Sequence, residues 1–205
     1  MKHVALGFCV HSGWVVLVAL GGPVASPTVV RRHRLEIADS SIRGSLQPYH
    51  AAKQMAASDA AVFVCQCARA ADSLARSALQ ATVAGLASDR FTVTGCSLLT
   101  GAGRPAISLE STLASHAMIH TAEGELFRNS VKSACEACGF PLFCIRERDL
   151  FPKAESLLRL TSGELKRQIS DLGAAIGPPW RADEKLSALA AWLHLSMRQS
   201  GLAAS

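Results

Sequence analysis

Two histidines and a glutamate in the middle of the chain have the residue types and the spacing of a metal site. His116, His120 and Glu123 stand at positions i, i+4 and i+7 of a segment that we expect to be helical. Steps of about 100° per residue bring the three side chains onto one face of that helix. Two imidazoles one turn apart can share a divalent ion, and the carboxylate can be a third ligand or can orient one ring. Simple packing or solvation of the two histidines accounts for the same pattern.

A glycine-rich turn precedes this helix and is a candidate phosphate-binding loop. Gly101, Gly103 and Arg104 follow the apolar run 91–99. Glycines let backbone N–H groups approach an anion, the start of a helix adds positive potential, and an arginine can hold a phosphate through two hydrogen bonds. The spacing differs from the P-loop and from the dinucleotide-binding fingerprint, so an ordinary tight turn fits equally well.

The first third of the chain predicts an antiparallel meander that leads to helical structure. Residues 4–10 and 14–20 are apolar runs separated by the turn 11–13, which indicates a hairpin. The run 28–38 alternates between apolar and charged residues, as a strand with one solvated face does. Residues 49–88 are rich in alanine and predict one long helix or two helices with a kink.

The middle of the chain predicts a βαβ unit. The apolar runs 91–99 and 141–145 flank the helix that carries His116, and Gly139 is placed to end that helix. Parallel strands bring the glycine-rich turn to their carboxyl edge, where open α/β sheets bind ligands. Further on, Phe151-Pro152 predicts a break, and Thr161 is expected to cap one of the short helices that follow. A final helix covers residues 182–197.

Composition limits the class of protein. Of the 205 residues 49% are hydrophobic and 18% are charged, which is typical of a globular chain. We expect a single domain, residues 1–205, with a helical insertion at about 151–179 before the last helix. The net charge of +5 favours anionic partners. Seven cysteines, an odd number, indicate reduced, buried thiols and a cytoplasmic location. The apolar run near the amino terminus imitates a signal peptide, but His11-Ser12-Gly13 interrupts it, and no other segment is long and apolar enough to predict a membrane span.

The order of these elements, together with two motifs, resembles the ribonuclease H-like superfamily. Residues 4–14 (VALGFCVHSGW) look like the first hairpin of its Holliday-junction-resolvase-like branch, and residues 180–190 (WRADEKLSALA) resemble the last helix of that branch. The resemblance implies an α/β fold with a mixed five-stranded sheet. Three antiparallel strands are followed by two parallel ones, with helices on both faces.

The resemblance also implies a site that this sequence does not fully match. Nucleases of the superfamily hold two divalent ions about 4 Å apart with acids on the first strand, the fourth strand and the last helix. Gly7, Phe8 and Cys9 stand where the first acid is expected, and residues 91–99 contain no Asp or Glu. Only Asp183 and Glu184 match, and the helix dipole alone explains carboxylates in a first helical turn.

In such a fold the last helix packs near the end of the first strand. We therefore expect Asp183 or Glu184 to approach His11 and Ser12, where a mixed cluster of histidine and carboxylate can bind one ion. The alternative is that these residues are ordinary surface groups.

Three functions remain open from the sequence. The first is a metal-dependent hydrolase, nuclease-like and acting on phosphodiesters or a nucleotide, with Mg²⁺ or Mn²⁺ ahead of Zn²⁺. Its ion would be held by His116, His120 or Glu123 together with Asp183 or Glu184, with His116, His120 and Asp183 as the metal ligands. The second is a catalytically inactive domain that binds nucleic acid or a protein partner. The third is a homodimer that clamps nucleotide phosphates with His11, Ser12 and the turn at Gly101, Gly103 and Arg104.

Overall fold

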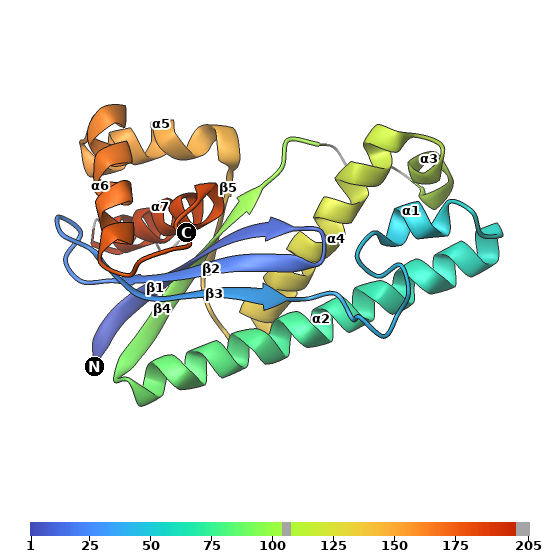
Figure 1. Ribbon diagram of the computed structural model, residues 1–205, viewed down its shortest axis with the longest axis horizontal. Helices are drawn as coiled ribbons and strands as arrows, with labels where there is room; N and C mark the ends of the chain where they lie inside the picture. The colour runs from blue at the N-terminus through green and yellow to red at the C-terminus, as the bar shows by residue number, and fades with distance from the viewer. Residues whose placement is uncertain (104–107, 200–205) are drawn as a thin grey trace.

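One mixed sheet organises the molecule. The computed structural model describes residues 1–103 and 108–199, and the strands in this part of the chain form a single five-stranded sheet of order β3-β2-β1-β4-β5 (Figure 1). The antiparallel meander consists of β1 (Lys2–His11), β2 (Trp14–Gly21) and β3 (Thr28–Glu36). The parallel strands β4 (Phe91–Thr100) and β5 (Leu142–Arg146) extend it beyond β1. The predicted α/β architecture is therefore confirmed.

The β1–β2 hairpin places His11 at the carboxyl edge of the sheet. Its loop consists of Ser12 and Gly13, and His11 pairs with Trp14 across it. Gly13 has a φ of 85°, and a Cβ there would lie 2.4 Å from the side chain of Leu46. Glycine is favoured at this position because the turn requires the left-handed region of φ, which side chains other than that of glycine rarely adopt.

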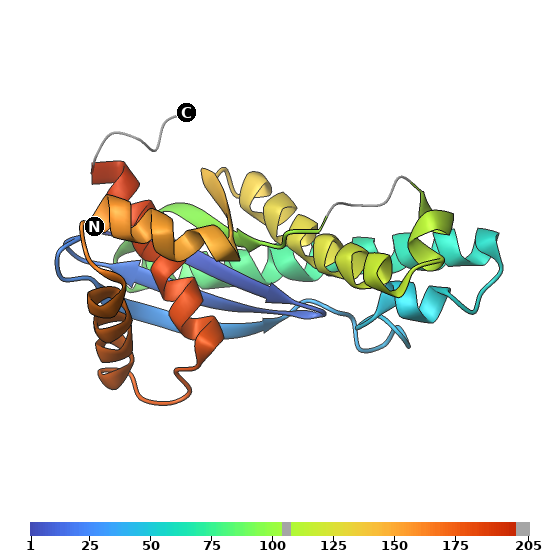
Figure 2. The same ribbon diagram turned by 90° about the horizontal axis from the view of Figure 1, so that it is seen from above.

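Helices cover both faces of the sheet. On one face lie α2 (Ala57–Ser88) and α4 (His116–Ala137); on the other lie α5 (Glu147–Leu158), α6 (Ser162–Ala174) and α7 (Ala182–Gln199) (Figure 2). A hydrophobic core lies on each face of the sheet. Successive side chains of β1 point into these two cores alternately, because side chains of a strand alternate between its faces. Leu6 and Phe8 join the core under α2 and α4, whereas Ala5 and Cys9 join the core under α7.

Helix α7 lies directly against β1 because Gly7 has no side chain. A Cβ at Gly7 would come within 1.9 Å of the backbone oxygen of Ser187. The Ser187 hydroxyl donates to the carbonyl of Val16 at 3.2 Å, and the indole N–H of Trp192 donates to the carbonyl of Val24 at 2.8 Å. These contacts fix the helix so that its first turn reaches the carboxyl end of β1.

Three helices differ from their predicted limits. Of the two arrangements predicted for residues 49–88, two helices are present, α1 (Pro48–Ala52) and α2, but a short non-helical stretch separates them in place of a kink. A separate helix α3 (Leu109–Leu113) precedes α4, which begins at His116 with Ser115 as its cap. The break predicted at Phe151-Pro152 is wrong, because α5 runs through Pro152. Leu150 and Ala154 are fully buried on either side of this proline, and their burial outweighs the one backbone hydrogen bond that it removes.

Two predicted helix ends are confirmed. Gly139 follows α4 with a φ of 70°, the left-handed conformation that ends many helices. Thr161 caps α6 and exchanges hydrogen bonds with Glu164 in a capping box.

All seven cysteines are free thiols, as predicted. The expectation that they are buried is wrong for Cys65 and Cys144, which are exposed. Of the helices in the described ranges, none has both the length and the apolar character of a membrane span.

Candidate functional sites

Three unlike ligand groups meet at the carboxyl end of β1, and we call them the strand-edge cluster: Cys9, His11 and Asp183. Nε2 of His11 lies 3.1 Å from Oδ1 of Asp183. The Cys9 thiol lies 3.7 Å from the same carboxylate oxygen and 3.8 Å from Nε2 of His11. The approach of Asp183 to His11, expected from the sequence, is therefore present. Ser12 lies next to it in the hairpin loop.

Neighbouring side chains hold the His11 ring. It stacks on Trp14 with ring centroids 4.1 Å apart and an interplanar angle of 14°. The guanidinium carbon of Arg34 lies 4.0 Å from the Trp14 ring on β2. His11 keeps 41% of its side-chain surface exposed and Asp183 keeps 29%, so solvent reaches the cluster.

Cys9 is the buried member of the strand-edge cluster. Burial and the negative charge of Asp183 raise the pKa of its thiol to about 12, and the charge of Glu147 adds to the effect. With no cation beside it, the thiol therefore keeps its proton and donates to Asp183.

A two-ion centre of the superfamily type does not fit this edge of the sheet. Cys9 occupies the first-strand position, and no residue of β4 (Phe91–Thr100) is an acid. Such a centre needs several carboxylates because Mg²⁺ and Mn²⁺ prefer oxygen ligands. Sulfur, nitrogen and a single carboxylate instead suit one ion of the zinc type.

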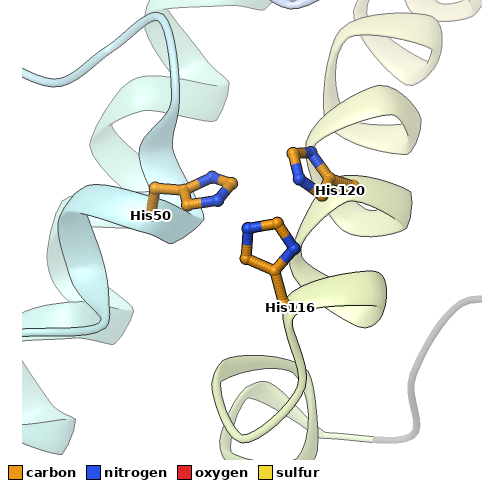
Figure 3. A group of neighbouring side chains, drawn as sticks. All are labelled: His50, His116 and His120. Carbon is orange, nitrogen blue, oxygen red and sulfur yellow. The ribbon is translucent and has the colours of Figure 1, made fainter.

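A second group of potential ligands lies between α1 and α4, and we call it the histidine cluster: His50, His116 and His120. One ring nitrogen from each lies within 4.8 Å of the others. Ring centroids are 4.4 Å apart for His116 and His120, 4.9 Å for His50 and His120, and 5.3 Å for His50 and His116. Figure 3 shows the His50 ring of α1 directed toward the two rings of α4.

Glu123 orients one member of the histidine cluster. Its Oε1 accepts hydrogen bonds from the backbone N–H of His50 at 3.1 Å and from Nδ1 of His50 at 2.9 Å. The carboxylate is only 1% exposed. It therefore orients the ring of His50, whose approach to α4 was not predicted. The one local signal in the sequence is Pro48, which marks the start of the helix that carries His50.

The shared metal site expected from the sequence is not formed as a single cluster. His116 and His120 meet His50, whereas Asp183 meets His11, and Figures 1 and 2 both place the start of α4 far from α7. Glu184 has another role: its buried carboxylate accepts from the backbone N–H of Arg181 at 2.8 Å and caps α7.

The glycine-rich turn borders a pocket at the same edge of the sheet as the strand-edge cluster. The pocket has a volume of about 360 Å³ and is lined by Thr100, Gly101, Ala102, Arg146, Glu147 and Arg148. Arg146 also pairs with Asp149 at 2.6 Å. Gly103 packs near Thr121 of α4, and Arg104 lies outside the described residues.

Comparison with known proteins supports the fold. No protein-family model matches the chain, and no curated protein matches it by sequence. Among solved structures, RuvC of Thermus thermophilus in complex with a Holliday junction substrate matches with a TM-score of 0.56 and 9% identity, covering 98% of this chain and 97% of that one. A second Thermus thermophilus RuvC structure gives the same TM-score and identity, with 97% coverage of both chains. The chain thus has the ribonuclease H-like fold that RuvC shares.

Proposed function

We propose that the protein acts on phosphodiesters of nucleic acid with one divalent ion at the strand-edge cluster. The observation that carries this proposal is the convergence of Cys9, His11 and Asp183 within 3.8 Å of one another. Ligand atoms of a tetrahedral zinc ion lie about 3.3–3.6 Å apart, given its usual bond lengths, so the cluster needs only small adjustments. Three protein ligands would leave a fourth position for water or substrate.

The surroundings of the cluster support a substrate of this class. The carboxyl ends of β1, β4 and β5 meet at the edge where ligands bind in open α/β sheets. Arg146 and Arg148 line the pocket beside it, and guanidinium groups suit a phosphate, which would compete with Asp149 for both of them. RuvC, with the same fold, has been seen with a DNA junction, which makes nucleic acid the first substrate to test.

The donor set changes the metal that we expect. From the sequence we expected Mg²⁺ or Mn²⁺, whereas a sulfur and a nitrogen ligand favour Zn²⁺. When bound, such an ion polarises a phosphoryl oxygen and lowers the pKa of its water. The stacked Trp14 would keep the His11 ring oriented, and Cys9 would give up its proton to become a ligand.

A nuclease assay tests the proposal. Metal-stripped protein is incubated with duplex and four-way-junction DNA and with RNA, with Zn²⁺, Mn²⁺ or Mg²⁺ added singly. We expect cleavage that needs metal and that falls by at least about 100-fold in His11→Ala and Asp183→Asn, since each removes a ligand. His3→Ala, an exposed histidine at the other end of β1, is the matched control. Cleavage that is equal in all four proteins would refute the site.

A second function has its own support. The missing acids of β4 and the protonated Cys9 thiol are also consistent with a domain that binds nucleic acid and does not cleave it. The basic run of β3 contributes little to such binding. Arg31 pairs with Asp89, Arg34 pairs with Glu36, and Arg32 donates to the carbonyl of Gly177 at 3.0 Å.

The salt dependence of DNA binding, measured together with cleavage, distinguishes this second function from the nuclease. Binding to duplex DNA that weakens steeply between 50 and 200 mM salt, without cleavage under any metal, would support it. Salt-insensitive binding, or none, would exclude it.

A further inference from the structure

We propose that His50, His116 and His120 form a separate zinc-binding site between α1 and α4, independent of the strand-edge cluster. The site would take one Zn²⁺ ion on three imidazole nitrogens and leave a fourth position open to solvent. It lies beyond the sheet, on helices that contribute nothing to the strand-edge cluster (Figures 1 and 3).

The strongest evidence is the buried carboxylate of Glu123. Nδ1 of His50 lies 2.9 Å from Glu123, and an ionised carboxylate can only accept, so Nδ1 would carry the proton and Nε2 would be left free to bind a metal. A carboxylate behind a histidine ligand is the usual arrangement at zinc sites, where it fixes the ring and makes it a better donor.

The charge of Glu123 also requires a partner. Its second oxygen, Oε2, is buried without a hydrogen bond in the described structure, and the group is 1% exposed. The ion pair found for Glu123 among the described residues is with His50, which is a cation only when protonated. A buried carboxylate without a compensating charge is costly, and a dication on the far side of the His50 ring would compensate it.

The geometry of the three rings suits this ion. Zn–N bonds of about 2.0–2.1 Å put tetrahedral ligand nitrogens roughly 3.3 Å apart. The nitrogens now lie within 4.8 Å of one another, so the rings need to close by about 1.5 Å or less. His116 and His120 are exposed and free to rotate by this amount, while His50 is held in place by Glu123. An all-nitrogen set favours zinc over Mg²⁺.

The experiment is a calorimetric titration of the metal-stripped 205-residue chain with Zn²⁺, repeated with Co²⁺ while visible absorption is recorded. We expect His116→Ala and His120→Ala to weaken one binding event by more than about 100-fold. Glu123→Gln, which keeps the shape of the side chain, should weaken the same event by about 10- to 100-fold. The exposed control His3→Ala should bind as the native protein does.

Asp183→Ala separates this site from the proposed phosphodiester site. If the two sites are independent, the histidine cluster keeps its Zn²⁺ affinity in Asp183→Ala. Co²⁺ bound at the histidine cluster should show d–d absorption bands without the sulfur-to-cobalt charge-transfer band that Cys9 would add. The native Zn²⁺ titration persisting in His116→Ala and His120→Ala would overturn the proposal. So would the absence of any Zn²⁺ binding, or the loss of all binding in Asp183→Ala.

Discussion

Substitution of Gly7 by alanine tests how the last helix is positioned. A Cβ at Gly7 would lie 1.9 Å from the Ser187 oxygen and 2.8 Å from the Ala191 nitrogen, both backbone atoms of α7. Real Cβ atoms essentially never come closer than 3.0 Å, so the helix would have to retreat by about 1 Å. That retreat would also draw Asp183 away from His11.

The expected loss of stability follows from this overpacking. Extra volume in a packed core costs about 1–3 kcal/mol, and a clash with rigid backbone belongs at the upper end, about 3 kcal/mol. For a chain of this size, each kcal/mol lowers the melting temperature by about 2–4 °C, so Gly7→Ala should lower it by about 6–12 °C.

Thermal unfolding followed by circular dichroism measures the effect of Gly7→Ala. The matched control is Gly163→Ala in α6, where nothing lies within 4 Å of an added Cβ. That variant should melt at or slightly above the native temperature, since alanine reduces the freedom of the unfolded chain. A Gly7→Ala protein that melts within about 1 °C of the native one would refute the placement of α7 on β1.

Three further predictions concern stability and thiol access. Burial lowers the pKa of His194 below its usual value of 6.5. As the pH falls, the unfolded chain therefore binds a proton at this histidine before the folded chain does. The melting temperature should therefore fall as the pH drops below about 6.5, and less so in His194→Gln, as scanning calorimetry from pH 8 to 5 would show. Thr161→Ala removes the cap of α6 and should cost about 1 kcal/mol in urea unfolding, whereas an unchanged midpoint would contradict the capping box. Iodoacetamide followed by mass spectrometry should modify the exposed Cys65 and Cys144 in the native protein but the buried Cys96 only after unfolding.

Local patterns predicted much of the fold because they are set by nearby residues. The hairpin at Ser12 and Gly13, the cap at Thr161 and the helix end at Gly139 each depend on residues within one turn. Pro152 shows the limit of this reasoning. Its local effect on the helix is outweighed by burial against segments that are distant in the sequence.

In the candidate sites, too, contacts within one helix could be predicted, whereas contacts between distant segments could not be predicted from local pattern. His116 and His120 could be paired from their spacing, because helical geometry alone brings them together. His50 comes from another helix, and only the packing of α1 on α4 brings it to them. The approach of Asp183 to His11 could be predicted only through the resemblance to a known fold, since the two residues are far apart in the sequence. Neither local pattern nor resemblance could show that the two groups of ligands stay apart.

Because α2 is longer than the sheet beneath it, its two ends should differ in local stability. Its 32 residues span roughly 48 Å, whereas the ten residues of β4 span about 33 Å, so its first turns extend past the sheet (Figure 1). Between residues 57 and 66 only Ala60 is buried, while the stretch from Cys67 to Leu86 carries a buried residue in nearly every turn. Amide hydrogen exchange should therefore be fast at the outer end and slow at the end against the sheet, within one continuous hydrogen-bonded element.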